Sequence, residues 1–297
     1  EELHEAVRAS RHGEAVSVDL VLESAGQPSS YRAVVAPLPE RAGVVGVLHD
    51  VTRQKLVDAV RRDFVANASH ELRTPLTAIR GFAETLKTGA INDAESTERF
   101  LDVILKHTLR LQALVNDLVA LSRAESPEQE YELTAVDLEE AVQDVVHGLE
   151  AQATQKNLDV RIDDLSELPP VVANPRALDQ VLINLVDNAI KYTPGGGQLE
   201  IRAEADAAFV TFEIENSGPG IPADQLQRIF ERFYRVDAGR SRDMGGTGLG
   251  LSIVRHLVAR MGGDIEAQSE PGEWTRFRLS LGRADSGSLR TLPPLPV

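Results

Sequence analysis

The sequence predicts a multidomain α+β protein with three folded parts in succession. Short strands follow one another near the N-terminus, two long amphipathic helices occupy the middle, and helices alternate with strands in the C-terminal half. A length of 297 residues suits two or three domains, and a hydrophobic content of 42% is sufficient to fill their cores.

The N-terminal part, residues 1–51, is predicted to be a helix followed by a small antiparallel sheet. Residues 1–11 have a helical pattern, and strand-like segments follow within 16–22, 31–36 and 44–48. A helix with three short strands is too small to be readily stable alone, so we expect it to be the later half of a small α/β domain.

The middle part, residues 52–124, is predicted to be an antiparallel helical hairpin. The first helix extends to about Thr88 and the second covers about 95–124. Each helix has a single apolar face and buries too little surface alone, so a dimeric four-helix bundle with a second copy is the economical solution. A long antiparallel coiled-coil spacer is the alternative that the pattern leaves open.

The third part, residues 133–282, follows a polar linker at 125–132 and is predicted to be an α/β sandwich with helices on one face of a mixed sheet. Helices are expected at 138–156, 175–192 and 251–261, and strands at 158–162, 198–203, 209–215, 265–269 and 275–281. The remaining tail, residues 283–297, is rich in Ser, Gly and Pro and is predicted to be disordered.

The balance of charge and the absence of cysteine exclude several classes of function. The chain carries 31 Lys and Arg against 46 Asp and Glu, a net charge of −15, which argues against nucleic acid as a partner. Without cysteine there are no disulfides, thiolate metal sites or thiol nucleophiles. No stretch approaches the roughly 18 apolar residues of a membrane span.

The most informative string in the first long helix is His70-Glu71-Leu72-Arg73-Thr74-Pro75-Leu76. Leu72 and Leu76 belong to the apolar face, and His70 lies two residues before Leu72, so it is predicted to point away from that face and to be exposed. An exposed imidazole beside a carboxylate is a possible nucleophile, and a merely solvated surface histidine is the alternative.

Helix 175–192, which Asn174 is placed to cap, is predicted to carry a polar stripe opposite its buried face. Asn184, Asn188 and Lys191 form this stripe because they are spaced by four and three residues. Amide oxygens suit Mg²⁺ held together with phosphates and waters, and a lysine can meet phosphate oxygens. A solvated helix face is the alternative.

Two glycine-rich segments follow. Residues 216–221 come directly after a strand, where glycine permits close approach of a flat ligand and a polar side chain can bond a base edge. Residues 245–251 hold four glycines before an apolar helix, like a loop that cradles phosphate, and a disordered surface loop is the alternative. A local basic run suited to polyphosphate lies before this loop: Arg232, Arg235, Arg240 and Arg242.

The order of these strings along residues 52–282 closely resembles that of the sensor histidine kinases of two-component systems. The strings stand where the family has its H, N, G1, F and G2 boxes: residues 70–75, 184–192, 218–221, 230–235 and 246–251. Residues 1–51 resemble the later half of a PAS sensor domain. The resemblance implies a dimeric four-helix bundle built from the hairpin, followed by an ATP-binding α/β sandwich.

The resemblance also implies catalytic roles in the hairpin. His70 is expected to attack the γ-phosphate of ATP, and Glu71 to orient its ring and accept a proton from it. Arg73 is expected to steady phosphate charge. Thr74 matches a pattern that the family links to phosphatase activity, where it positions a hydrolytic water.

The resemblance implies ATP and Mg²⁺ as cofactors of the sandwich. Asn188, with Asn184, is the expected Mg²⁺ ligand. The ATP-binding residues implied are Asn184, Asn188, Lys191, Tyr192, Asn216, Gly218, Gly220, Ile221, Arg235, Gly246, Thr247, Gly248, Leu249 and Gly250. Asn216 stands where the family usually has Asp, a departure that we expect to weaken ATP binding modestly.

The expected partners are a second copy of the chain and the receiver domain of a response regulator, whose aspartate takes the phosphoryl group from His70. Because the chain begins at Glu1 with a helix already in progress, we expect a cytoplasmic fragment of a longer protein linked to the bacterial inner membrane. Two other classes stay open, a non-catalytic dimeric module that binds nucleotide and an ATPase of the gyrase or chaperone type. Asn216 favours the first, and the string at His70 argues against the second.

Overall fold

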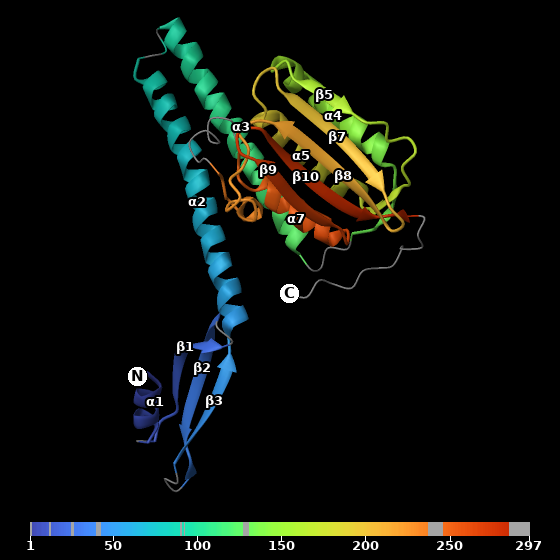
Figure 1. The fold of residues 1–297 in the computed structure, drawn as a ribbon. Helices are drawn as coiled ribbons and strands as arrows, with labels where there is room; N and C mark the ends of the chain where they lie inside the picture. The colour runs from blue at the N-terminus through green and yellow to red at the C-terminus, as the bar shows by residue number, and fades with distance from the viewer. Residues whose placement is uncertain are drawn as a thin grey trace. The chain divides into compact units, whose positions relative to one another are not determined.

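The computed structural model describes residues 2–11, 13–24, 27–39, 43–89, 91, 93–126, 131–236 and 246–284. The chain divides into two compact units, Glu1–His70 and Glu71–Val297 (Figure 1). Most of the predicted tail, part of the predicted linker, and Arg240 and Arg242 lie outside the described residues.

The first unit contains a helix and a three-stranded antiparallel sheet, as predicted. Helix α1 (Glu2–Ser10) precedes strands β1 (Val16–Ser24), β2 (Gln27–Pro37) and β3 (Val44–Asp50), which pair in the order β1-β2-β3. One face of β2 is buried through Ala33 and Val35. The other face leaves the paired residues Val34 and Val47 exposed, so it presents an apolar surface that none of the described residues of this unit covers.

Two long helices follow, α2 (Thr52–Lys87) and α3 (Ala94–Glu125), close to the predicted ranges. Helix α2 begins in the first unit, ends in the second, and continues through the buried Pro75. Asp93 caps α3 by accepting a hydrogen bond from the backbone nitrogen of Ser96 at 3.3 Å. None of the described helices has a stretch long and apolar enough to cross a membrane.

Within the second unit α2 and α3 form an antiparallel hairpin. The rings of Phe82 and Phe100 lie 5.3 Å apart, and the Arg110 Nη2 atom lies 2.9 Å from the Glu71 Oε2 atom. This register places Leu76 and Leu105 at the same level. Leu76, which belongs to the predicted apolar face, is 60% exposed in the single chain.

The exposure of Leu76 is part of a wider apolar face on the hairpin. Along α3, Leu101, Leu105 and Leu109 recur every four residues and are each more than half exposed. Four-residue spacing places them on one side of the helix. Phe82 and Phe100 meet between the two helices, whereas this other apolar face remains open to a partner.

The rest of the second unit is the predicted α/β sandwich. Its sheet has five strands in the order β5-β7-β8-β10-β9, with β5 parallel to β7 and the other pairs antiparallel. The strands are β5 (Asp159–Ile162), β7 (Gln198–Ala205), β8 (Phe209–Ser217), β9 (Asp264–Glu270) and β10 (Trp274–Gly282).

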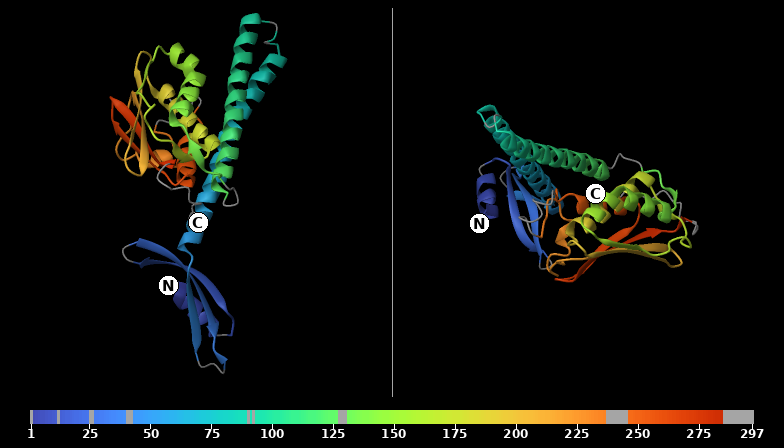
Figure 2. Two further views of the ribbon diagram at one scale, coloured as in Figure 1. Left: turned by 90° about the vertical axis from the view of Figure 1, so that its right-hand side faces the viewer. Right: turned by 90° about the horizontal axis from the view of Figure 1, so that it is seen from above.

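Helices α4 (Leu138–Gln155), α5 (Pro175–Tyr192) and α7 (Gly250–Arg260) cover one face of this sheet (Figure 2). Strands β8 and β10 alternate buried with partly exposed residues, which directs Ile214 and Leu279 toward the helices. Three short elements are not predicted by the sequence, because they are too short to show a period: strands β4 (Thr134–Val136) and β6 (Val171–Ala173) and the 3₁₀ turn η3 (Arg228–Phe230).

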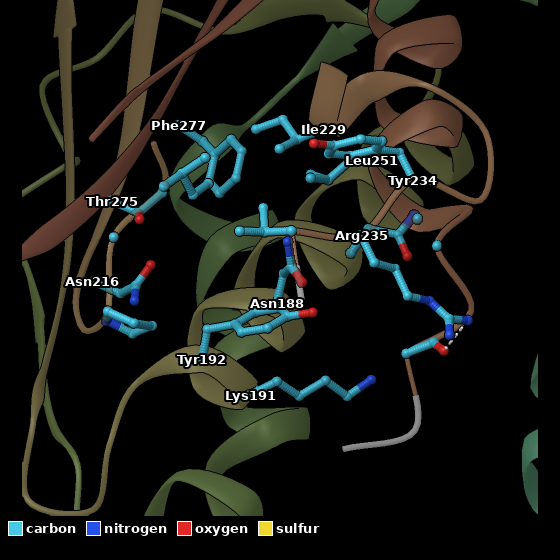
Figure 3. A pocket seen from close by; sticks show the side chains of 18 of the residues that line it. Asn188, Lys191, Tyr192, Asn216, Ile229, Tyr234, Arg235, Leu251, Thr275 and Phe277 are labelled. Carbon is cyan, nitrogen blue, oxygen red and sulfur yellow. Dashed lines mark hydrogen bonds between the residues drawn. The ribbon is translucent and has the colours of Figure 1, made fainter. Parts of the chain in front are cut away.

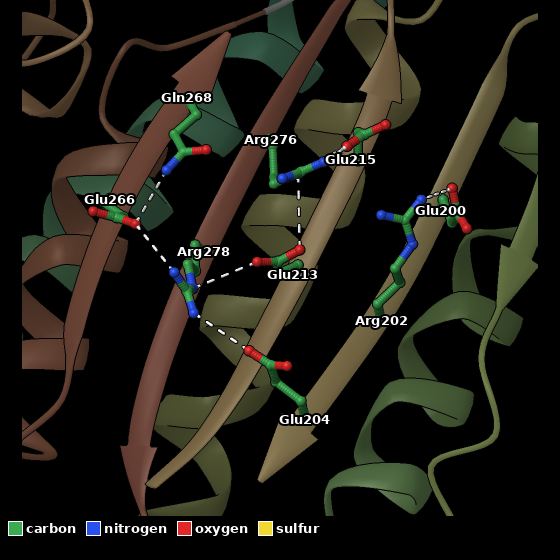
Figure 4. A network of polar contacts seen from close by, with 9 residues as sticks. All are labelled: Glu200, Arg202, Glu204, Glu213, Glu215, Glu266, Gln268, Arg276 and Arg278. Carbon is green, nitrogen blue, oxygen red and sulfur yellow. Dashed lines mark hydrogen bonds and ion pairs between the residues drawn. The ribbon is translucent and has the colours of Figure 1, made fainter. Parts of the chain in front are cut away.

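The other face of the sheet carries a network of charges (Figure 4). Arg276 on β10 lies 2.8 Å from Glu215 on β8, measured from Nε to Oε2, and 3.8 Å from Glu213. Arg278 reaches Glu213 and Glu204, each at 3.4 Å. Opposite charges on neighbouring strands keep this face hydrated and explain why helices cover only one side.

Candidate functional site

One cavity of about 390 Å³ collects most of the predicted binding residues (Figure 3). Asn216 and Thr275 lie on one side of it, and Lys191 and Arg235 on the other (Figure 3). The sequence-predicted residues that line it are Asn184, Asn188, Lys191, Tyr192, Asn216, Gly220, Ile221, Arg235, Gly246, Gly248 and Gly250. The cavity therefore joins a buried amide at one end to cationic side chains at the other.

Three predicted residues are not among the described lining of the cavity. Leu249 is fully buried in the core, and the Thr247 hydroxyl donates to Asp117 instead. A Cβ atom on Gly218 would lie 2.9 Å from the Tyr192 carbonyl oxygen, so this glycine allows two backbone segments to approach. Spacing alone does not reveal which side of a glycine-rich loop faces a cavity.

The lining also contains residues that are not among the predicted binding residues: Asp187, Pro219, Pro222, Ile229, Tyr234, Val236, Leu251, Thr275 and Phe277. Helical spacing could have indicated Asp187, which stands four residues before Lys191. Thr275 is the partner of Asn216 in the β8–β10 register, so it could not be found before the pairing was known.

Helix α5 is built to present the polar stripe to the cavity. The Asn174 side chain caps it by accepting from the Ala177 backbone nitrogen at 3.1 Å, as predicted, and its apolar face is buried on the sheet. On the polar side, the Asn184 amide nitrogen is buried without a hydrogen-bond partner in the described structure. The Lys191 ammonium lies 2.6 Å from the Asp187 carboxylate.

The C-terminal end of α5 is capped by the side chain of Lys156. Its ammonium donates to the carbonyl oxygens of Ile190, Lys191 and Thr193 at 2.8, 2.7 and 3.1 Å. These are carbonyls that a helix end leaves without partners, and the cation also complements the helix dipole. Burial lowers the pKa of Lys156. Lys156 thereby holds the backbone that carries Lys191 and Tyr192 at the cavity.

Replacing Lys156 by Met is expected to lower the free energy of unfolding by about 1–3 kcal/mol, because carbonyl groups lose a charged donor. Urea unfolding of the purified protein measures this change. Lys55→Met is the matched control, since it removes an exposed lysine that pairs with Asp19. Equal effects of the two substitutions would contradict the role of Lys156.

The opposite end of the cavity is shaped by the turn after β8. Asn216 is only 3% exposed, and its Nδ2 atom donates to the Ser217 carbonyl oxygen at 3.1 Å, which leaves Oδ1 as an acceptor. Gly220 has a φ of 67°, and a Cβ atom there would lie 2.4 Å from the Glu270 carbonyl oxygen. Only glycine fits this position without a shift of the backbone.

The cationic end is shaped by the segment around Arg235 and by the start of α7. The Phe233 backbone nitrogen donates to the Gly248 carbonyl oxygen at 2.7 Å, and Gly248 has a φ of 78°. The Arg235 Nη2 atom donates to the Gly246 carbonyl oxygen at 2.7 Å. This arrangement keeps Arg235 at the cavity wall.

The predicted residues of the hairpin lie on exposed or half-exposed positions of α2. His70, Arg73 and Thr74 are exposed, as expected for His70, and Glu71 is half-buried. The Glu71 Oε2 atom lies 2.9 Å from Arg110 Nη2 and 3.1 Å from Arg235 Nη2. Glu71 thus meets an arginine from α3 and another from the cavity wall.

Asp117 on α3 accepts a hydrogen bond from the Thr247 hydroxyl at 2.6 Å. Burial raises the pKa of the Asp117 carboxyl, and the hydrogen bond from Thr247 opposes part of that rise. A carboxylate that is costly to ionise therefore stands where α3 meets the glycine-rich loop.

Asp117→Asn is expected to raise the thermal midpoint near pH 7 by about 2–4 °C, the shift for roughly 1 kcal/mol in a unit of this size. The pKa of Asp117 is higher in the folded state than in the unfolded state. Ionisation of Asp117 therefore destabilises the fold, and this destabilisation is fully present at pH values above the folded-state pKa. It disappears below about pH 4, where both states are protonated. Melting curves near pH 7 and pH 4.5 check this, and a larger gain at the lower pH would contradict it.

Two family models match the sequence in succession. HisKA, the His Kinase A (phospho-acceptor) domain, matches residues 60–127. HATPase_c, the histidine kinase-, DNA gyrase B-, and HSP90-like ATPase, matches residues 173–285. The first match contains His70 and most of the hairpin, and the second contains the residues that line the cavity.

Curated relatives include the sensor protein kinase WalK of Staphylococcus saprophyticus, 37% identical over 241 residues, and the sensor histidine kinase WalK of Bacillus subtilis, 36% identical over 247 residues. Each alignment covers 80% of this chain and 39% of the relative. The chain thus spans well under half the length of these relatives.

Solved structures show the same fold. The chain resembles full-length ShkA in complex with AMPPNP, with a TM-score of 0.56 and 31% identity, over 74% of this chain and 46% of that chain. It also resembles the Acinetobacter baumannii histidine kinase AdeS, with a TM-score of 0.58 and 27% identity, over 72% and 98% of the two chains. The two family models in this order, together with the WalK relatives, show that the chain belongs to the sensor histidine kinases of two-component systems.

Proposed function

We propose that the protein transfers the γ-phosphoryl group of ATP to His70 and then to an aspartate of a response-regulator receiver domain. The observation that carries this proposal is the polarity of the cavity, with an amide acceptor at one end and cationic side chains at the other. Its elements belong to the segment that matches the ATPase family, and the similar ShkA structure holds AMPPNP.

The two ends of the cavity suit different parts of ATP, the adenine at the Asn216 end and the phosphates at the end with Lys191 and Arg235. The Asn216 Oδ1 atom is available to the adenine amino group, and Phe277 and Ile229 offer apolar contact to the base. Lys191, Tyr192 and Arg235 are then the residues for the sugar and phosphates. Gly246, Gly248 and Gly250 would let the backbone approach the triphosphate.

The residues present fit a Mg²⁺ ion that is bound together with phosphate. Asn184 and Asn188 line the cavity one helical turn apart, so both amides can present an oxygen to it. The described residues contain no cluster of three or more acidic or histidine side chains that could hold a metal, so amide oxygens and phosphate oxygens would supply the ligands. When bound, Mg²⁺ neutralises charge on the phosphates.

In the proposed reaction a neutral His70 ring nitrogen attacks the γ-phosphorus, and the bond from this phosphorus to the bridging oxygen of ADP breaks. Glu71 accepts the proton from the other ring nitrogen. Arg73 steadies phosphate charge. We propose that the protein also dephosphorylates the regulator, with Thr74 positioning the attacking water.

We propose that the hairpin pairs with a second copy. The exposed stripe of Leu101, Leu105 and Leu109, level with Leu76, is the face that a dimeric four-helix bundle would bury. Sedimentation equilibrium tests this assignment, with a mass twice that of the chain expected and a monomer at micromolar concentration contradicting it.

We propose further that residues 1–51 are the later half of a PAS-like sensor domain, followed by the hairpin at 52–124 and the ATP-binding domain at 133–282. The antiparallel sheet with an uncovered apolar face supports a sensor domain that extends further. We expect this chain to be the cytoplasmic portion of a membrane-linked protein, in keeping with the greater length of its relatives.

Incubation with Mg²⁺ and γ-labelled ATP tests the catalytic proposal. The protein should gain a phosphate that acid removes and alkali does not, as expected for phosphohistidine. Tight binding of ATP without any label would instead favour a non-catalytic nucleotide-binding module.

A further inference from the structure

Glu71 is held by arginines from two different parts of the second unit. Arg110 belongs to α3 within the hairpin, whereas Arg235 belongs to the wall of the cavity. Both guanidinium groups donate to the same Glu71 oxygen, at 2.9 and 3.1 Å. The side chains of Glu71, Arg110 and Arg235 are 24%, 13% and 8% exposed, so this cluster is largely shielded from water.

Arg235 is poorly satisfied in this arrangement. Its Nη2 atom serves both Glu71 and the Gly246 carbonyl oxygen, while its Nε atom is buried without a partner in the described structure. A buried donor without a hydrogen-bond partner raises the free energy of the conformation in which it is buried. A phosphate offers several oxygens that match the fork of a guanidinium, so Arg235 has better partners to gain inside the cavity.

We propose that Arg235 is shared between Glu71 and the terminal phosphate of a nucleoside triphosphate, so that filling the cavity frees Glu71 from Arg235. Arg110 remains on Glu71 and acts as a positioning residue. This inference rests on the proposed function, because it assigns a use to the cavity and to Glu71.

The consequence for Glu71 follows from helix geometry. Neighbouring residues on a helix point about 100° apart, so Glu71 must turn its carboxylate to reach His70. While two arginines hold the same oxygen, the carboxylate is drawn toward α3 and the cavity wall. When phosphate draws Arg235 away, the Glu71 carboxylate is released from one of its two partners. Filling of the cavity would therefore be coupled to a Glu71 that can accept the proton of His70.

Sharing of one arginine predicts a reciprocal effect on binding. If Glu71 and the terminal phosphate compete for Arg235, then removing the charge of Glu71 must strengthen binding of the triphosphate. Binding can be measured with the non-hydrolysable analogue AMPPNP, so the readout does not depend on catalysis by Glu71.

The test is a calorimetric double-mutant cycle of Glu71→Gln and Arg235→Gln, with Mg²⁺ and either AMPPNP or ADP. Glu71→Gln should tighten AMPPNP binding about fivefold, the lower end of typical coupling between linked sites, and leave ADP binding nearly unchanged. In the Arg235→Gln background, Glu71→Gln should have no effect on AMPPNP binding.

Two control variants distinguish the sharing of Arg235 from a general weakening of the contacts that α3 makes. Glu125→Gln breaks a different contact of α3, because Glu125 lies 2.6 Å from Arg232 and 3.6 Å from His256, neither of which is in the described cavity lining. Arg110→Gln removes the other partner of Glu71 without touching the cavity. Neither substitution should tighten AMPPNP binding.

Unchanged AMPPNP affinity in Glu71→Gln, or an equal gain in the Arg235→Gln background or in either control, would overturn the inference. Failure of the proposed function gives a different result, because the unsubstituted protein would then bind no AMPPNP or gain no label from ATP.

Discussion

Replacing His70 by Gln is expected to abolish labelling from Mg²⁺ and ATP. His70 is exposed on α2 and is the only described histidine within the string that resembles the family's phospho-acceptor motif. Glutamine keeps a polar side chain of similar size in the helix but has no nucleophilic ring nitrogen. Nucleotide binding should be preserved, because His70 is not in the described cavity lining.

His147→Gln is the matched control for this substitution. His147 is also exposed on a helix, at 86%, but belongs to α4 and lies 3.4 Å from Glu150. It should retain full labelling. Label that persists in His70→Gln, with the same acid lability, would show that another residue accepts the phosphoryl group.

Replacing Asn188 by Ala is expected to reduce Mg²⁺-dependent labelling by at least roughly 100-fold, since loss of even an outer-shell partner of a metal costs about 10–100-fold. The substitution removes an amide oxygen that we assign to the metal. Alanine is the best helix former, so α5 should persist, and circular dichroism should show an unchanged fold.

Gln180→Ala is the control on the same helix. Gln180 is a further amide on α5 but is not in the described lining of the cavity, so its loss should leave labelling unchanged. Higher Mg²⁺ concentrations should partly restore activity to Asn188→Ala. Unimpaired labelling at low Mg²⁺ in this variant would refute the assignment of Asn188.

Local patterns of the sequence were sufficient for most of the fold. Helix α5 has the predicted bounds, 175–192, because its cap, its proline and its apolar spacing all act within the helix itself. The five strands of the sandwich sheet lie within a few residues of prediction, since alternation along a strand is also local. The sequence places Leu76 on an apolar helix face, but only the structure shows that this residue stays 60% exposed in the single chain.

The candidate site was predictable only where its residues stand in recognisable strings. Asn188 and Lys191 share a helix face, so their approach to one cavity follows from helical spacing. Thr275 and Phe277 reach the same cavity through the pairing of β10 with β8, a contact between segments some sixty residues apart. Lys156 also belongs to this group, because its carbonyl partners come from the far end of another helix.

The sequence by itself determined the family, the order of the domains' elements and the candidate chemical groups, because these depend on short strings and local periodicity. The tertiary structure alone decided which side chains meet. It brings Arg110 and Arg235 to the same oxygen of Glu71, and Asp117 to Thr247. Such pairs join distant segments, and their geometry arises only when helices and loops pack around a common core.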